Sequence, residues 1–110
     1  MDYIPDQGDI IWLNFDPSSG KEIVKRRPAF VISRKAFSEH TALAIVAPIT
    51  STVRGIKLEV VLPGHLITQG SVLVHQLKSL DFHHRQAEFI EKVPANIAQQ
   101  VSSIAQVLIR

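Results

Sequence analysis

The sequence has 110 residues, 45% of them hydrophobic, which is enough for one folded core and too little for two. Twelve Lys and Arg against ten Asp and Glu give a formal net charge of +2, well short of the strongly basic balance of a protein that packs DNA. The absence of cysteine excludes disulfides, cysteine-ligated zinc and thiol catalysis.

Neither a targeting segment nor a membrane segment is recognisable. The N-terminus lacks the ordered basic, apolar and small-residue regions of a signal peptide. No apolar run approaches the roughly 20 residues that span a bilayer. We therefore expect a single cytoplasmic domain over residues 1–110 that does not enter a membrane.

Short β-strands are predicted along most of the chain, separated by turn residues. The first ends at the turn sequence DPSSG, and the second is apolar enough to be buried on both faces. A short helical turn is predicted at 35–40 and a polar loop at 50–57. The predicted strands cover residues 8–15, 29–33, 43–49, 58–62, 71–76, 77–80 and 87–91.

A helix is predicted from Pro94 to the C-terminus. Ile97, Val101, Ile104 and Leu108 recur at steps of four, three and four, which places them on one helical stripe. Short strands followed by one amphipathic helix predict a mainly β fold, either a small barrel or a curled sheet closed by the helix. Exposed apolar surface on the strands and the helix could also be buried in a two-fold dimer.

The densest positive charge stands directly in front of a proline, in the sequence KRRP. Pro28 restrains Arg27 to an extended conformation, so this arginine is better ordered than one in a free loop. An ordered guanidinium can bind a phosphate through two parallel hydrogen bonds. A solvated charged loop explains the same residues equally well.

Two further side chains near these cations are candidates for chemistry. Thr50 ends the third predicted strand, where its hydroxyl either donates to a phosphate oxygen or satisfies a turn. Glu22, five residues before Arg27, either orients that guanidinium or is an ordinary surface acid. Trp12 and Phe15 lie on a predicted strand and are expected to pack in the core, although the tryptophan could also line a groove for a partner.

The five histidines do not have the spacing of a metal site, so no metal is expected. His75 is the one that merits attention, because alternation along the predicted strand places it on the face of Leu73 and Leu77. It is either a proton donor or acceptor at neutral pH, or a partly buried histidine bonded to backbone.

The segments taken together resemble the MazF/PemK family of bacterial toxin endoribonucleases, and the resemblance covers essentially the whole chain. The most specific piece is the GDI, Trp, Asp-Pro, Gly and Glu of the first segment, followed by Arg-Pro in the next. The matching segments are residues 5–22 (PDQGDIIWLNFDPSSGKE), 26–33 (RRPAFVIS), 46–50 (VAPIT), 58–62 (LEVVL) and 72–85 (VLVHQLKSLDFHHR).

The resemblance implies an SH3-like small β-barrel of the PemK/CcdB type, closed by a C-terminal helix. It implies a homodimer whose RNA-binding groove is covered by the disordered tail of a cognate antitoxin protein. The implied activity is sequence-specific cleavage of single-stranded RNA without metal or cofactor. The ribose 2′-OH attacks the neighbouring phosphate, leaving a 2′,3′-cyclic phosphate and a 5′-OH end.

Site residues follow from the same resemblance. Arg27 falls on the family's catalytic arginine, Thr50 on its catalytic threonine and Glu22 on its loop glutamate. Arg27 is assigned to the phosphate charge first, because a group with a pKa above about 12 is a poor general base. The expected RNA contacts are Lys21, Lys25, Arg26, Thr52, Arg54, Lys57, Gln76 and Lys78.

The sequence departs from the family's pattern at two places. Some relatives carry an Arg-x-Asp pair where this chain has Leu73 and His75, so we expect His75 to serve in proton transfer or in base recognition. Lys21 stands where several relatives carry histidine, and the loop reads IVK after Glu22 where a Gln-Gly pair is usual.

Two other functions fit a chain of this kind. The first is a gyrase-binding toxin of the CcdB type, which shares the fold and needs no catalytic site. The second is a small non-catalytic barrel that binds RNA, which would show salt-dependent binding and no cleavage. The pairing of Arg27 with Thr50 argues for the nuclease.

Overall fold

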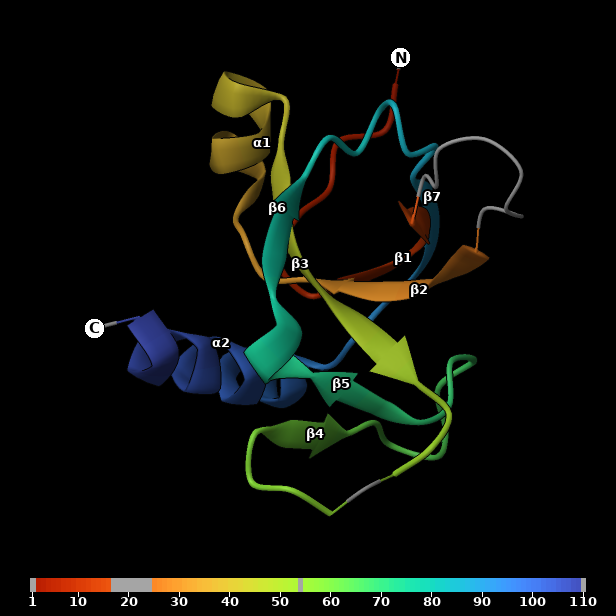
Figure 1. Ribbon diagram of the computed structural model, residues 1–110, viewed down its shortest axis with the longest axis vertical. Coiled ribbons are helices and arrows are strands. Elements are labelled where there is room, and N and C mark those ends of the chain that lie inside the picture. The colour runs from red at the N-terminus through yellow and green to blue at the C-terminus, as the bar shows by residue number, and fades with distance from the viewer. Residues whose placement is uncertain (1, 17–24, 54, 110) are drawn as a thin grey trace.

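The computed structural model describes residues 2–16, 25–53 and 55–109, without the side chains of residues 16 and 25. Short antiparallel strands dominate this part of the chain, and a long helix ends it (Figure 1). The elements in order are β1 (Asp9–Asp16), β2 (Lys25–Val31), α1 (Lys35–Thr41), β3 (Ala44–Thr50), β4 (Glu59–Val61), β5 (Ser71–Leu73), the 3-10 helix η1 (Val74–Gln76), β6 (Lys78–Leu80), β7 (Glu88–Lys92) and α2 (Ala95–Ile109).

The strands form one curved sheet in the order β4-β5-β3-β2-β1-β7, with β6 paired to β3 off this path. Besides its pairing with β2, β3 has two further partners: residues 44–46 pair with β6, and Ile49 and Thr50 pair with β5. The outermost strands of the path, β4 and β7, are not paired with each other in the described residues. The architecture is therefore mainly β with a C-terminal helix, and over the described residues the sheet is not closed into a barrel.

Alternation along the strands divides the core between the two faces of the sheet. Ile10 and Phe30 are paired across β1 and β2 and belong to the cluster that packs on α2. Their neighbours Ile11 and Ala29 are also paired, and they belong to a second cluster on the opposite face. All four side chains are fully buried, which confirms the prediction that the second strand is covered on both sides.

The second cluster defines the face of the sheet that carries the candidate site. Its buried members are Ile11, Leu13, Phe15, Ala29, Val31, Ala44, Val46 and Leu80. We call this side the open face, because α2 packs on the other one (Figure 1).

The predicted helix is present, and its stripe is buried only at its beginning. Ile97 and Val101 are buried against the sheet, and Ile104 is partly buried. Leu108 is 38% exposed and Ile109 is 75% exposed, because α2 extends past the sheet at its C-terminal end. None of the described helices is long and apolar enough to cross a membrane.

The N-terminal segment is tied to α1 and β7 by two carboxylates. The Asp6 carboxylate accepts a hydrogen bond of 2.9 Å from the backbone N–H of Lys35, the first residue of α1. Asp9 is buried, forms a 2.8 Å ion pair with Lys92 and accepts a hydrogen bond from the Tyr3 hydroxyl. Burial and the bond to Asp9 raise the pKa of Tyr3.

Three predictions about the fold were wrong. The strand predicted at 71–76 stops at Leu73, and His75 lies in η1, because the chain turns there to leave β5 and reach β6. β2 begins at Lys25 rather than at Ala29, so the cations lie within the strand and not in front of it. Trp12 is 40% exposed and not in the core, because it faces away from Leu13 and Ile11.

Candidate functional site

A pocket of about 280 Å³ lies where β2, β3 and the segment before β5 meet. It combines a cation, two hydroxyl groups and an amide from three parts of the chain. Its lining residues are Arg27, Pro28, Ile49, Thr50, Ser51 and Gln69.

Strand register places Arg27 and Thr50 on the same face. β2 and β3 are antiparallel, with Ala29 paired to Pro48 and Phe30 to Ala47. The ladder ends at that first pair, but alternation along each strand places Arg27 on the face of Ala29 and Thr50 on the face of Pro48, and both residues line the pocket. Arg27 is exposed and Thr50 partly exposed, so both functional groups can reach a ligand.

The hydroxyl of Thr50 is oriented by the turn that follows it. The backbone N–H of Thr52 donates to Thr50 Oγ1 over 3.2 Å, so one acceptor position of this oxygen is filled. The hydroxyl proton remains available for an acceptor in the pocket, such as a phosphate oxygen. Thr50 is also held by pairing with Ser71 of β5.

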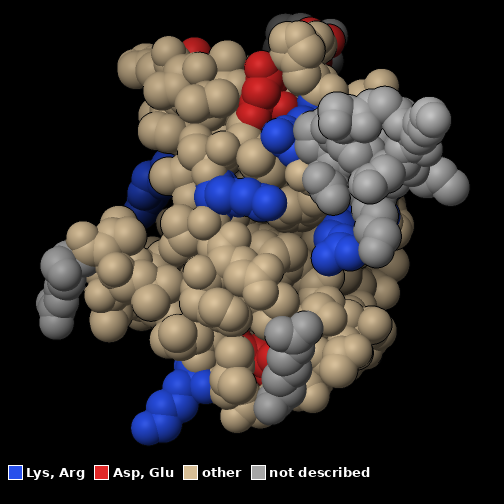
Figure 2. Space-filling model, in the orientation of Figure 1, with Lys and Arg blue, Asp and Glu red and all other residues tan. Residues whose placement is uncertain are grey.

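Lys78 adds a second cation to the same side of the sheet. It is paired with Val46 across β3 and β6 and is therefore on the open face. Its Nζ lies 5.2 Å from the centre of the Phe15 ring, a cation–π contact that holds the side chain over the sheet. Figure 2 shows Lys and Arg side chains over β6 and β2, on the side where these strands are seen in Figure 1.

Arg26 is directed to the opposite side from Arg27. Its guanidinium donates 3.1 Å to Asn14 Oδ1 and forms a 3.0 Å ion pair with Glu88 of β7. Neighbouring residues of a strand point to opposite faces, which explains why only one of these two arginines lines the pocket.

The other predicted RNA contacts lie outside this pocket or outside the described residues. Thr52, Lys57 and Gln76 are exposed and do not line the pocket. Lys21, Glu22, Arg54 and the side chain of Lys25 lie outside the described residues. His75 is exposed on η1, so the expected face with Leu73 and Leu77 was wrong, as was the alternative of partial burial.

Sequence reasoning missed two residues that shape the pocket. Gln69 contributes an amide to it, and nothing in the sequence singles this residue out. Gly70 has a φ of +116° and packs against the Thr50 backbone. A lone glycine just before a strand is a recognised sign of close backbone approach, and could have identified Gly70.

A metal site is not formed by the described part of the chain, where no three His, Asp or Glu side chains come together in a suitable arrangement. Among these side chains, His84 has one carboxylate partner: its Nδ1 lies 2.8 Å from Oδ2 of Asp81. Hydrogen bonds from His84 to that exposed carboxylate lower its pKa.

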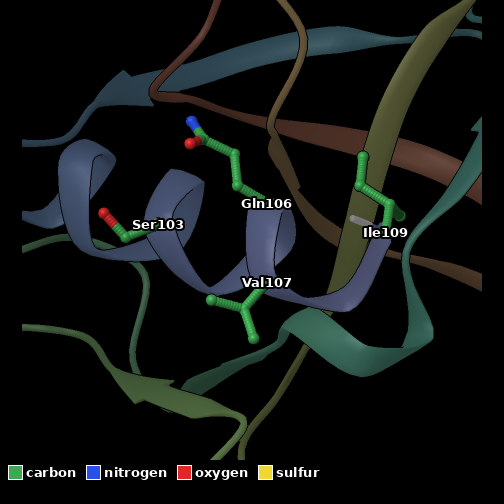
Figure 3. A pocket seen from close by; sticks show the side chains of 4 residues that line it. All are labelled: Ser103, Gln106, Val107 and Ile109. Atoms are coloured by element: carbon green, nitrogen blue, oxygen red, sulfur yellow. The ribbon is translucent and has the colours of Figure 1, made fainter.

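A second pocket, of about 360 Å³, lies at the C-terminal end of α2 and is lined by Ser103, Gln106, Val107 and Ile109 (Figure 3). Figure 3 shows Gln106 and Val107 leaving the helix in different directions. Among the described residues, this pocket is lined by no charged side chain and shares no residue with the Arg27 pocket.

Comparison with known proteins points to one family. The family described as "PemK-like, MazF-like toxin of type II toxin-antitoxin system" matches residues 6–109. The endoribonuclease toxin MazF of Escherichia coli strain K12 is 36% identical over 107 residues, covering 97% of this chain and 96% of that protein. Endoribonuclease PemK of E. coli is 32% identical over 100 residues, covering 87% and 75%. A MazE-MazF crystal structure from Deinococcus radiodurans superposes with a TM-score of 0.90 at 41% identity, covering 98% and 97%.

Proposed function

Because the chain belongs to the family of PemK-like, MazF-like toxins of type II toxin–antitoxin systems, we propose that it cuts single-stranded RNA at specific sequences and thereby inhibits translation and growth. The observation that carries this proposal is the presence of Arg27 and Thr50 in one pocket on the open face. Relatives named endoribonucleases cover nearly the whole chain, which supports the same activity.

The proposed reaction needs no metal ion. The ribose 2′-OH attacks the adjacent phosphorus and gives up its proton to solvent, the bond to the 5′ oxygen of the next nucleotide breaks, and that oxygen takes up a proton. The products are a 2′,3′-cyclic phosphate and a 5′-OH end. Negative charge grows on the non-bridging oxygens as the new bond forms, and a fixed cation with a fixed hydroxyl donor stabilises it.

Each residue of the pair has a distinct part in this scheme. Arg27 presents several N–H donors in a plane and can bind two phosphate oxygens at once. Thr50 donates its free hydroxyl proton to the same phosphate. Glu22 is proposed to orient the Arg27 guanidinium. Arg27 is not given a role in proton transfer, because an arginine stays protonated at neutral pH.

The surrounding polar residues are proposed to hold the RNA strand on either side of the cut. Lys78 is the best supported of them, because it shares the open face with Arg27 and Thr50. Arg26 is proposed as a peripheral contact, since Glu88 and Asn14 already occupy its guanidinium. His75 is proposed to meet a base beyond the pocket. The other proposed contacts are Lys21, Lys25, Thr52, Arg54, Lys57 and Gln76.

The same family membership supports proposals about assembly and architecture. We propose that the single domain forms a homodimer in the cytoplasm and that a cognate antitoxin covers the Arg27 pocket. Solved structures titled MazE-MazF complexes support the partner. For the complete fold we propose an SH3-like barrel closed by the helix; the curvature of the sheet in Figure 1 and the change of partner along β3 support it.

A gyrase-binding function is not favoured. It requires no paired arginine and threonine, and the relatives that match most of this chain carry endoribonuclease names. A non-catalytic RNA-binding barrel differs from the proposed nuclease only in leaving RNA intact, so one cleavage assay distinguishes them.

That assay incubates a long single-stranded RNA with the protein in excess EDTA and maps the chemistry of every new end. We expect discrete cuts with 5′-OH and 2′,3′-cyclic phosphate ends. Thr50→Val keeps the shape of the side chain and removes the hydroxyl, and it should abolish most of the cutting, whereas Thr50→Ser should retain it. Intact RNA after incubation with folded wild-type protein would overturn the proposal.

A further inference from the structure

Gln69 lies in the pocket with Arg27 and Thr50 although it comes from a distant part of the chain. It stands two residues before Ser71, which is paired directly with Thr50. Its side chain is exposed, so a ligand held by Arg27 and Thr50 would lie within its reach. A residue in this place can contact RNA next to the phosphate that is cut.

The hydrogen bonds of Gln69 determine which end of its amide is left without a partner among the described residues. Nε2 donates to the carbonyl oxygen of Leu66 over 2.6 Å and to that of Gly64 over 3.3 Å. Both partners can only accept, so the nitrogen has to be the atom that faces them. Both N–H groups are used in this way, and no described residue donates to Oε1. The amide oxygen is therefore a free acceptor in a fixed orientation.

The turn that carries Gln69 is anchored from the other side. The Glu91 carboxylate of β7 accepts a 3.1 Å bond from the backbone N–H of Ile67 and a 2.7 Å bond from that of Thr68. Leu66 and Thr68 are buried on either side of the exposed Ile67. Little reorganisation is needed before Gln69 can bind, because bonds at several points fix the backbone and the amide together.

The chemistry of this acceptor differs from that of its neighbours. Arg27, Thr50 and Ser51 offer N–H and O–H groups, which suit the oxygens of a phosphate. A phosphate diester has no donor for Oε1, whereas every nucleobase has an N–H on its pairing edge. The bases of single-stranded RNA are accessible for contacts of this kind.

We propose that Gln69 is a specificity-determining residue, whose Oε1 accepts a hydrogen bond from an amino or imino N–H of a base adjacent to the cut phosphate. This inference rests on the proposed RNA cleavage and adds the group that reads one base. An acceptor left unpaired by a wrong base disfavours that base, and discrimination of about tenfold or more follows from one such hydrogen bond.

The test is cleavage of an RNA pool with randomised sequence, with all cut sites read by sequencing. Wild type should prefer one base, or a pair of bases that share a donor position, at one place beside the cut. Gln69→Leu should reduce that preference by about tenfold at that place and leave preferences elsewhere unchanged. Gln69→Met is the second variant, for use if the leucine variant does not fold.

Two control variants separate recognition from general damage to the turn. Glu91→Gln weakens the anchor without touching Oε1, so it should lower the rate and keep the base preference. Gln100→Leu changes an exposed glutamine of α2 and should alter neither. A base analogue without the N–H donor at the preferred place should slow wild type about tenfold and leave Gln69→Leu unaffected.

The possible results are distinct from one another. If wild type does not cut RNA, the proposed function fails and the inference fails with it. If wild type cuts and Gln69→Leu keeps the full base preference at every place, the function stands and the inference is wrong. A lower rate with unchanged preference in Gln69→Leu would likewise overturn it, because that result shows only a structural role.

Discussion

Gly70 packs directly against the backbone of Thr50: a β-carbon at position 70 would lie 2.0 Å from the Thr50 carbonyl oxygen and 2.8 Å from its carbonyl carbon. The same glycine has a φ of +116°, which a residue with a side chain rarely adopts. The start of β5 can therefore lie against the end of β3 only with glycine at this position. That contact determines where the Thr50 hydroxyl stands relative to Arg27.

We expect Gly70→Ala to impair both folding and RNA cleavage. The added methyl group has to displace the backbone of Thr50, and the φ angle adds strain, so the free energy of unfolding should fall by about 1–3 kcal/mol or more. Chemical denaturation and cleavage rate at a temperature where the variant is folded would measure the two effects.

Two other glycines provide matched controls for that variant. Gly64→Ala meets nothing within 4 Å and should leave the stability almost unchanged. Gly55→Ala also meets nothing, but its φ of +71° is strained, so it should cost about 1 kcal/mol without altering cleavage. Equal effects of the three substitutions would contradict the importance of the contact with Thr50.

Lys78→Ala should weaken RNA binding in a salt-dependent manner. Each phosphate contact on a single strand contributes about −0.7 to the slope of log affinity against log salt concentration, so the slope should become shallower by about that amount. Binding of an RNA with a 2′-deoxy group at the cut position, measured from low to high salt, tests this without cleavage. Lys35→Ala, on α1, is the control and should keep the wild-type slope. An unchanged slope for Lys78→Ala would remove it from the binding surface.

His75→Ala should retain the cleavage rate at a given site and change which sites are chosen. The ring is exposed on η1 and does not line the Arg27 pocket, so contact with a base is the part that its position allows. Sequencing of the fragments from one long RNA gives both rate and site preference. A variant that equals wild type in both would show that His75 has no part in the reaction.

Stability should fall in acid partly through Glu91. Although burial raises the pKa of this carboxyl, hydrogen bonds from Thr68 and Ile67 outweigh it and hold the pKa below its ordinary value of 4.5. A depressed pKa in the folded state stabilises the fold above the unfolded pKa, and that contribution is lost as pH falls through the folded one. The stability difference between wild type and Glu91→Gln should thus be largest near neutral pH and shrink below about 4.5.

Denaturation of both proteins at pH 7, 4 and 3 measures this difference. Glu39→Gln, an exposed position on α1, is the control and should follow wild type throughout. A gap between wild type and Glu91→Gln that persists unchanged at pH 3 would show that the carboxylate does not anchor the turn.

Local pattern was sufficient to predict most of the elements. Apolar β-branched runs identified β1 and β3, which are buried on both faces, and the four-three-four spacing identified α2, which is buried on one face. The start of β2 was predicted too late in the chain because of Pro28, since a proline within a sheet is usually confined to an edge strand or to the first residue of a strand. The ladder between β2 and β3 begins only at Ala29, whereas the pairing of β2 with β1 includes Pro28 and continues to Lys25.

Residues of the site could be predicted only where the family resemblance or the end of a predicted strand pointed to them. Arg27 and Thr50 were found in this way, and the structure brings them into one pocket. Gln69 could not be found, because its place depends on the turn between β4 and β5 and on the distant anchor Glu91. His75 was misplaced because alternation was continued past Leu73, where the chain leaves the sheet.

The most direct test of the whole account compares two neighbouring arginines on one RNA substrate. Arg27 lines the pocket, whereas Arg26 is bound to Glu88 on the other side of the sheet. Arg27→Ala should lower the single-turnover cleavage rate by about 10²–10³. Arg26→Ala should change it by only a few-fold and cost at most about 1 kcal/mol of stability. Equal losses from the two substitutions, or full activity in folded Arg27→Ala, would contradict the proposed site.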